Sequence, residues 1–215
     1  MLRSAMFLII CSALIASAPA SADANEVYGK AKIAIHSDYA LQPKQKDRFA
    51  EFKRRNNVFY SAFVVNTRSD TFYTMTDEHS LEDAQAQGIA GCRMVSPPDA
   101  AKSCTLYASA TPTGGAVANI PLSGTISMSL SKEIAKALKS SKHETFVAVA
   151  INHVGAWGLV WNQQTEAVAR ERALKECDTA TKDPNRMRLY PDALIKANRS
   201  RGGFKCQVVS AFRTK

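Results

Sequence analysis

Two stretches of the chain carry the same succession of apolar and polar positions. The mainly apolar runs 60–66 and 146–152 each end in an asparagine, and a second run with aromatic residues follows each of them, at 71–75 and at 156–161. Short runs of this kind, separated by polar turn residues, are typical of strands. The pattern therefore predicts one hairpin in each stretch.

A capped helix is predicted after each hairpin. Ser80 and Thr165 stand in front of first turns that contain acids, an arrangement that satisfies free helix N–H groups and contributes about 1 kcal/mol per cap. Apolar residues then recur at spacings of three, four and eight as far as Cys92 in one copy and Cys177 in the other. Because these spacings place them on one helix face, we expect each helix to pack against its hairpin.

Further elements complete a repeated unit. Alternating residues predict a first strand at 32–35 and 125–130, helices follow at 44–55 and 131–140, and a cysteine opens a final strand at 104–108 and 206–210. The order is β-α-β-β-α-β in both copies, which is that of the ferredoxin-like fold. We therefore expect an α+β protein made of two tandem ferredoxin-like repeats.

Proline and glycine residues mark the boundary between the copies. We expect the first repeat to span residues 23–112, a linker to span residues 113–118 and the second repeat to span residues 119–215. The pattern leaves open whether the repeats form two domains or share one fused sheet.

The first 22 residues are typical of a secretory signal peptide. Arg3 is followed by an apolar run of 11 residues, and Ala20-Ser21-Ala22 supplies the small residues of a cleavage site. The apolar run is shorter than the roughly 20 residues of a membrane span. We therefore expect export to the periplasm or secretion, a mature chain of 193 residues once 22 of the 215 are removed, and no transmembrane helix in that chain.

Export would place the four cysteines of the mature chain in an oxidising compartment, which favours disulfides. Four cysteines allow three connectivities. In each copy one cysteine ends the predicted helix and the next opens the final strand, so pairing within each copy is the consistent choice. We expect the disulfides Cys92–Cys104 and Cys177–Cys206.

The order of these features resembles a known family. A strand, a polar turn, an aromatic strand, a hydroxyl cap, an Ala-rich helix ending in Cys and a Cys-Xaa-Val-Val strand follow one another, most clearly in Ala148–Ala150, Trp157-Gly158, 169–177 and 206–209. This succession resembles the DUF4189 domain, a small secreted bacterial module of unknown function. The resemblance implies secretion and transfers no catalytic residue. The chain is also similar to short exported proteins labelled 5-aminolevulinate synthase, but 193 secreted residues cannot supply the large fold and cofactor site of such an enzyme.

Most of the net positive charge lies in two segments. The chain has 28 Lys and Arg against 19 Asp and Glu, a net charge of +9, and both 44–55 and 178–205 have a net charge of +4. Residues 178–205 are an insertion of 28 residues between two cysteines, where the first copy has 11. Long loops in compact domains are often functional. We expect the insertion to contain one short amphipathic helix and to bind an anionic partner through Arg186, Arg188, Lys196, Arg199, Arg201 and Lys205.

No local motif indicates an enzyme. The four histidines lack metal-ligand spacing, and Ser129-Leu130-Ser131-Lys132 lacks the companion motifs of an acyl-enzyme site. Asp77-Glu78-His79 is the most suggestive trio, and we interpret it as a solvated turn in front of a helix cap. His153 is interpreted as a polar residue of the second hairpin turn. We therefore expect no metal and no cofactor.

These observations favour a non-catalytic binding module. Its expected partner is an envelope polymer, an anionic membrane surface or an acidic protein, whereas nucleic acid is not expected outside the cytoplasm. Two alternatives remain, an envelope enzyme such as a hydrolase with a site of dispersed residues, and a structural envelope component. A histidine and a carboxylate that converge on a pocket would favour the enzyme.

Overall fold

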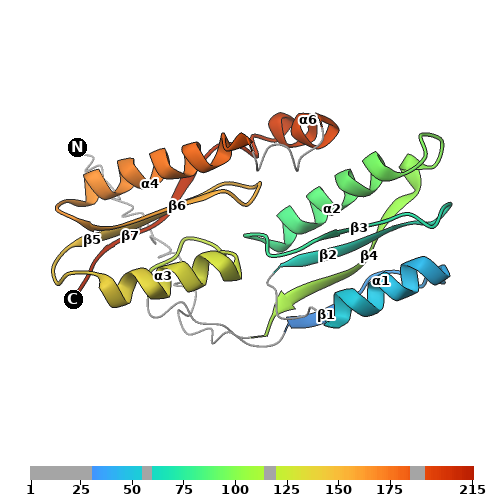
Figure 1. Ribbon diagram of the computed structural model, residues 1–215, viewed down its shortest axis with the longest axis horizontal. Helices are drawn as coiled ribbons and strands as arrows, with labels where there is room; N and C mark the ends of the chain where they lie inside the picture. Colours follow the sequence, from blue (N-terminus) through green and yellow to red (C-terminus); the bar gives the residue numbers. More distant parts are fainter. Residues whose placement is uncertain (1–30, 55–59, 114–119, 185–191) are drawn as a thin grey trace, which may run out of the picture.

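The computed structural model describes residues 31–54, 60–113, 120–184 and 192–215. The expected signal peptide, nearly all of the expected linker, and Arg186 and Arg188 lie outside the described residues. The described chain is α+β, with two antiparallel sheets that lie side by side (Figure 1). None of the described helices combines the length and apolar character needed to cross a membrane.

The first half forms a four-stranded antiparallel sheet of order β1-β4-β2-β3. Its elements are β1 (Ala31–Ile35), α1 (Pro43–Arg54), β2 (Ser61–Asn66), β3 (Phe72–Met75), α2 (Leu81–Val95), a 3-10 turn (Ala101–Ser103) and β4 (Cys104–Pro112). The strands and helices predicted for this half are all present, so the order β-α-β-β-α-β is confirmed here.

The second half forms a three-stranded antiparallel sheet of order β6-β5-β7. Its elements are α3 (Met128–Ser140), β5 (Phe146–Ile151), β6 (Trp157–Gln163), α4 (Glu166–Thr181), α6 (Asp192–Ser200) and β7 (Gln207–Arg213). This sheet repeats the β3-β2-β4 part of the first sheet, and α6 is the helix predicted within the insertion.

The first strand predicted for the second half, at 125–130, is wrong. Residues 125–127 form no strand, and α3 begins at Met128 after Ser127, whose side chain accepts a hydrogen bond from the Leu130 N–H. Ile126, Leu130 and Ile134 are all buried in one cluster. Leu130 and Ile134 lie one helical turn apart on α3, and Ile126 packs with them from just before the helix, so Leu130 belongs to a helix face and not to a strand.

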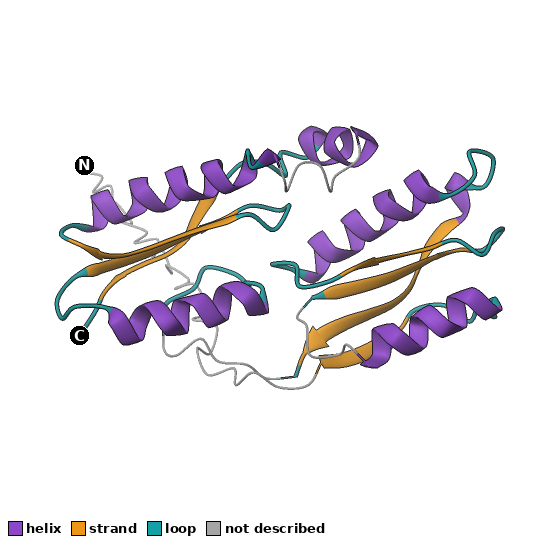
Figure 2. Cartoon of the chain, viewed as in Figure 1, coloured by secondary structure: helices purple, strands orange, loops and turns teal. Residues whose placement is uncertain are grey.

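Helices cover both faces of each sheet (Figure 2). In β2, Phe63 and Val65 pack in the cluster of α1, where the Phe63 and Phe49 ring centroids lie 5.3 Å apart, while Ala62 and Val64 pack in the cluster of α2. Successive strand residues point to opposite faces, so a strand between two helices is buried along its whole length. The ferredoxin-like arrangement that we expected is not confirmed, and no strand precedes α3 in the described residues of the second half.

The second sheet is covered in the same way. Val149 and Ile151 of β5 pack in a cluster with α3, and Ala148 and Ala150 pack in a cluster with α4. Small side chains on the α4 face allow that helix to approach closely. At Gly158 of β6 the approach is closest, because a Cβ there would collide with backbone atoms of α4.

The helix caps of the two halves are equivalent. Ser80 precedes α2 and Thr165 precedes α4, both with extended backbone, and each hydroxyl accepts a hydrogen bond from the third N–H of its helix. Three residues before each cap the backbone has a positive φ, 60° at Asp77 and 57° at Asn162. The prediction that Ser80 and Thr165 occupy matching positions is therefore confirmed.

Both predicted disulfides are confirmed. Cys92 at the end of α2 is bonded to Cys104 at the start of β4, with Cα atoms 6.0 Å apart. Cys177 in the last turns of α4 is bonded to Cys206 just before β7, with Cα atoms 6.1 Å apart. Each bridge therefore ties a helix to the last strand of its own half.

An asparagine at the end of the first hairpin strand supports each disulfide. Asn66 Nδ2 donates to the Ala100 carbonyl oxygen and Asn152 Nδ2 donates to the Thr181 hydroxyl, both at 2.7 Å. Each Nδ2 also lies within 3.9 Å of a disulfide sulfur of its own half. Asn152 Oδ1 accepts the N–H groups of Val154 at 3.1 Å and Ala156 at 2.9 Å, which fixes the hairpin turn.

Replacing this asparagine tests its structural role. We expect Asn152→Ala to lower the free energy of unfolding by about 2–3 kcal/mol, because two backbone N–H groups and one hydroxyl lose a buried partner. Chemical denaturation with intact disulfides measures the loss. Asn152→Asp keeps the acceptor for both N–H groups and should lose less than Asn152→Ala. Equal stability of Asn152→Ala and the wild type would contradict this role.

Candidate functional site

The insertion joins the two halves. Its helix α6 belongs to the second half and packs against α2 of the first half. Leu194 of α6 is 1% exposed, and Asn198 on the same helix is also buried. Part of the insertion, which we predicted to be a binding segment, is therefore a brace between the halves.

Asp77 caps a helix of the other half. Its carboxylate accepts the Met128 N–H at 2.7 Å and the Ser129 N–H at 3.3 Å, so it lies at the N-terminus of α3. The free N–H groups and the dipole of a helix favour a negative charge at this end. The turn before α2 thus holds the first helix of the second half in place.

His79 is buried in the same junction. Its Nδ1 accepts the Ser127 N–H at 3.1 Å, its Nε2 lies 3.4 Å from the Ala156 carbonyl oxygen, and its own carbonyl oxygen accepts the Thr125 hydroxyl at 2.6 Å. His79 is 1% exposed and Glu78 is 5% exposed. The prediction that Asp77-Glu78-His79 is a solvated turn is therefore wrong, because the second half covers it.

A buried carboxylate forms the centre of the junction. Asp83 of α2 is 3% exposed, and its oxygens lie 3.1 Å from His153 Nδ1 and 3.4 Å from Arg201 Nη1. The Ser80 hydroxyl donates to the same carboxylate at 2.8 Å. Arg201 Nη2 also donates to the His153 carbonyl oxygen at 3.2 Å. The hairpin turn that contains His153 is thus part of this junction and more than a polar turn.

A basic pocket lies beside the second disulfide. It has a volume of about 500 Å³, and Lys182, Arg199 and Lys205 contribute its cations. Asp178 is its one acidic lining residue among those described, and Phe204 adds an apolar surface. The helix ends position the cations, since Lys182 is the C-cap of α4 and Arg199 lies in the last turn of α6. Cations are favoured at helix C-termini. We call this site the basic pocket.

The predicted binding residues divide between three places. The structure brings Arg199 and Lys205 together in the basic pocket, whereas Lys196 is exposed on α6 and does not line it. Arg201 does not line the basic pocket and pairs instead with buried Asp83, with 29% of its own side chain exposed. The other two predicted arginines lie outside the described residues. Lys182 was not among the predicted residues, although its charge was part of the basic segment.

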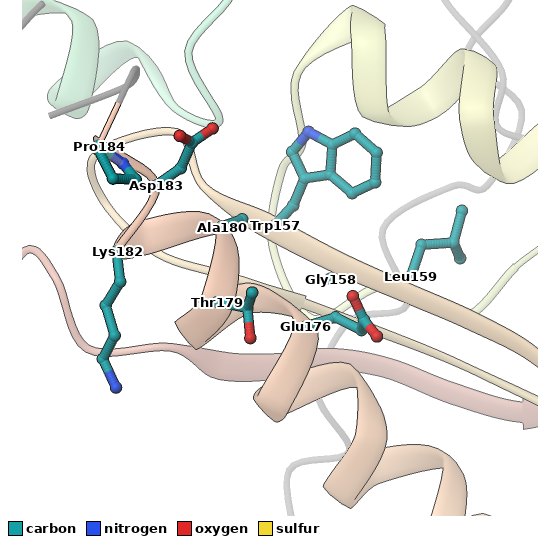
Figure 3. A pocket seen from close by; sticks show the side chains of 9 residues that line it. All are labelled: Trp157, Gly158, Leu159, Glu176, Thr179, Ala180, Lys182, Asp183 and Pro184. Atoms are coloured by element: carbon teal, nitrogen blue, oxygen red, sulfur yellow. The ribbon is translucent and has the colours of Figure 1, made fainter. Parts of the chain in front are cut away.

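A second concavity follows the edge of the second sheet. It has a volume of about 700 Å³ and lies between β6 and the end of α4 (Figure 3). Its lining residues in the described chain are Trp157, Gly158, Leu159, Glu176, Thr179, Ala180, Lys182, Asp183 and Pro184. The half-buried Trp157 indole and the Glu176 carboxylate lie on opposite sides of β6 (Figure 3). We call this site the Trp157 groove, and it shares Lys182 with the basic pocket.

The described lining residues of the two concavities include no metal site. No cluster of three or more His, Cys, Asp or Glu that suits a metal ion occurs in the part of the chain that the structure describes.

Tyr73 has a clearly shifted pKa and lines neither concavity. Burial, followed by the charge of Glu78, raises the pKa of the Tyr73 hydroxyl above its ordinary value of 10. Tyr73 is therefore a neutral packing residue at physiological pH.

Comparison of the chain with protein-family models, curated proteins and solved structures gives no match. The junction, the basic pocket and the Trp157 groove are therefore the features that indicate a function.

Substitution of two arginines in the insertion tests whether this segment holds the two halves together. We expect Arg201→Gln to lower the free energy of unfolding by about 1–2 kcal/mol, because buried Asp83 loses a charged partner. Arg199→Gln is the matched control, and we expect it to change stability by less than about 0.5 kcal/mol, because that side chain is exposed. Thermal or chemical unfolding of both variants measures the difference. Equal stability of the two variants would contradict the assignment of Arg201 to the junction.

Proposed function

We propose that the protein is an exported, non-catalytic module that binds an anionic ligand in the basic pocket. The signal-peptide pattern and the resemblance to the DUF4189 domain support export, and the two disulfides fit an oxidising compartment outside the cytoplasm. We also propose that the two halves are copies of one module. Matching caps, asparagines and disulfides support this duplication.

The observation that carries the proposal is the convergence of three cations in one concavity. Lys182, Arg199 and Lys205 come from two helix ends and from the segment before β7. None of the three forms an ion pair within the described residues. Like charges held close together repel one another, and a bound anion relieves this repulsion. The pocket is therefore better suited to an anion than scattered surface lysines are.

The rim of the pocket favours an extended ligand over a small enclosed one. Its cations are exposed, and the pocket opens widely to solvent. Interactions between exposed charges are screened beyond about 8–10 Å at physiological salt. A ligand with several negative charges along its length therefore gains more than a single ion does. An acidic envelope polymer is the partner class that fits best.

Inorganic polyphosphate is a defined probe for this proposal. We expect the wild type to bind it at low salt and to lose most of the affinity at physiological salt, because the contacts are screened. We expect the triple variant Lys182→Gln, Arg199→Gln and Lys205→Gln to bind at least about tenfold more weakly, since the local positive potential is removed. Isothermal titration calorimetry measures both effects.

A second triple variant separates the pocket from overall charge. Lys132, Lys139 and Lys142 are exposed residues of α3 and the segment after it, and none of them lines the pocket. Changing all three to Gln removes the same three charges from a different place. We expect this variant to retain wild-type affinity. If both triple variants lose affinity equally, the binding depends on net charge and the pocket has no special role.

The junction offers one observation in favour of an enzyme. His153 Nδ1 lies 3.1 Å from buried Asp83, which is how a carboxylate orients a general base. The imidazole is half exposed, since 49% of the side chain is accessible. However, the hydrogen bonds that it forms within the described residues all go to Asp83, and it lines neither concavity. The pair is therefore better explained as a contact between the halves.

Activity assays distinguish the two explanations. We expect the wild type and His153→Gln to hydrolyse nitrophenyl esters, phosphate esters and glycosides at the same background rate, because the described residues place no nucleophile in contact with the imidazole. Hydrolysis by the wild type that His153→Gln loses would replace the binding proposal by a hydrolase. Unfolding curves of both proteins check that the variant is folded.

A further inference from the structure

We propose that the anionic ligand is an acidic glycan, and that the Trp157 groove binds one of its neutral sugar units. This inference rests on the proposed function, because it uses the basic pocket for the acidic groups. It names the chemical class of the ligand and adds a second binding surface to the first.

The two concavities meet at one residue at the end of α4. Lys182, the C-cap residue of α4, lines both of them. Its side chain points away from the indole in Figure 3, and its flexible stem lets the ammonium group serve either side of the turn. A chain-like ligand that follows this turn therefore meets an aromatic surface on one side and three cations on the other.

The lining of the Trp157 groove matches the surface of a sugar. Trp157 lines the groove at the edge of β6 while part of its side chain packs against the apolar cluster under α3, and aromatic faces suit the apolar C–H groups of a sugar ring. The Glu176 carboxylate and the Thr179 hydroxyl supply acceptors for sugar hydroxyl donors. A largely apolar wall with a few polar groups is typical of sites for small organic ligands.

The Glu176 carboxylate also indicates where an acidic group does not bind. It repels a phosphate or carboxylate beside it, so acidic groups are favoured only on the Lys182 side of the groove. Neutral hydroxyl groups, by contrast, form stronger hydrogen bonds with carboxylates than with neutral acceptors. The arrangement of charge therefore favours a ligand in which neutral and acidic sugars alternate.

Trp157 fluorescence provides the binding signal. Trp161→Phe removes the other tryptophan, which is exposed and does not line the groove. In this background, we expect hyaluronan hexasaccharide, in which acidic and neutral sugars alternate, to change the fluorescence of Trp157 in a saturable way. The neutral chitohexaose should bind at least about tenfold more weakly, because it lacks the acidic groups that the basic pocket attracts.

Glu176 gives the sharpest test, because the proposal and a purely electrostatic site predict opposite signs. Glu176→Ala loses a hydrogen-bond acceptor, so we expect about tenfold weaker binding of hyaluronan hexasaccharide and no weaker binding of polyphosphate. Glu171→Ala removes an exposed carboxylate of the same helix outside the groove and is the matched control. If binding depended on charge alone, both variants would bind the hexasaccharide equally well or more tightly than the parent.

The outcomes separate this inference from the proposed function. No fluorescence response to the hexasaccharide, or the same affinity for Glu176→Ala and Glu171→Ala, overturns the acidic-glycan assignment. Polyphosphate binding that still depends on Lys182, Arg199 and Lys205 then leaves the proposed function standing. If that dependence is also absent, both proposals are overturned.

Discussion

Asp83 is almost fully buried at the first turn of α2, where it meets His153 and Arg201 of the other half. A carboxylate in this environment is costly unless it is paired and hydrogen-bonded, so the second half has to approach closely enough to supply both partners. This requirement fixes the hairpin turn after β5 and the segment after α6 against α2. Asp77 adds a parallel constraint through the N-terminus of α3.

The position of the basic pocket follows from this constraint. Arg201, held by Asp83, lies two residues beyond Arg199, and α6 packs against α2. The Cys177–Cys206 disulfide fixes the other side, because Lys205 precedes one of its cysteines. The insertion thus combines two roles along its length, with buried residues that brace the halves and exposed cations that face a common concavity.

The two halves differ where they meet. Asp83 is the third residue of α2, and the equivalent third residue of α4 is Val168, which is 38% exposed. The equivalent position in α2 faces the other half, whereas Val168 faces solvent. The two halves also differ in the segment between their cysteines. It has 28 residues and supplies α6 in the second half, whereas the equivalent segment of the first half has only 11 residues. The repeated module therefore accounts for the hairpins, caps and disulfides, and the departures from it create the junction and the basic pocket.

Local chemistry in the sequence was sufficient for the hairpins, the caps at Ser80 and Thr165, the helix in the insertion and both disulfides. Hydrophobic period and capping act over a few residues, and the repeated cysteine positions allowed one consistent pairing. Burial of His79 depends instead on partners 48 and 77 residues away, and the meeting of Lys182 with Arg199 and Lys205 depends on how α4 and α6 end. A local sequence pattern cannot predict contacts between residues so far apart in the chain. The same polar turn sequence can be covered by water or by the other half of the protein. Only the tertiary structure decided which charges are buried partners and which are available to a ligand.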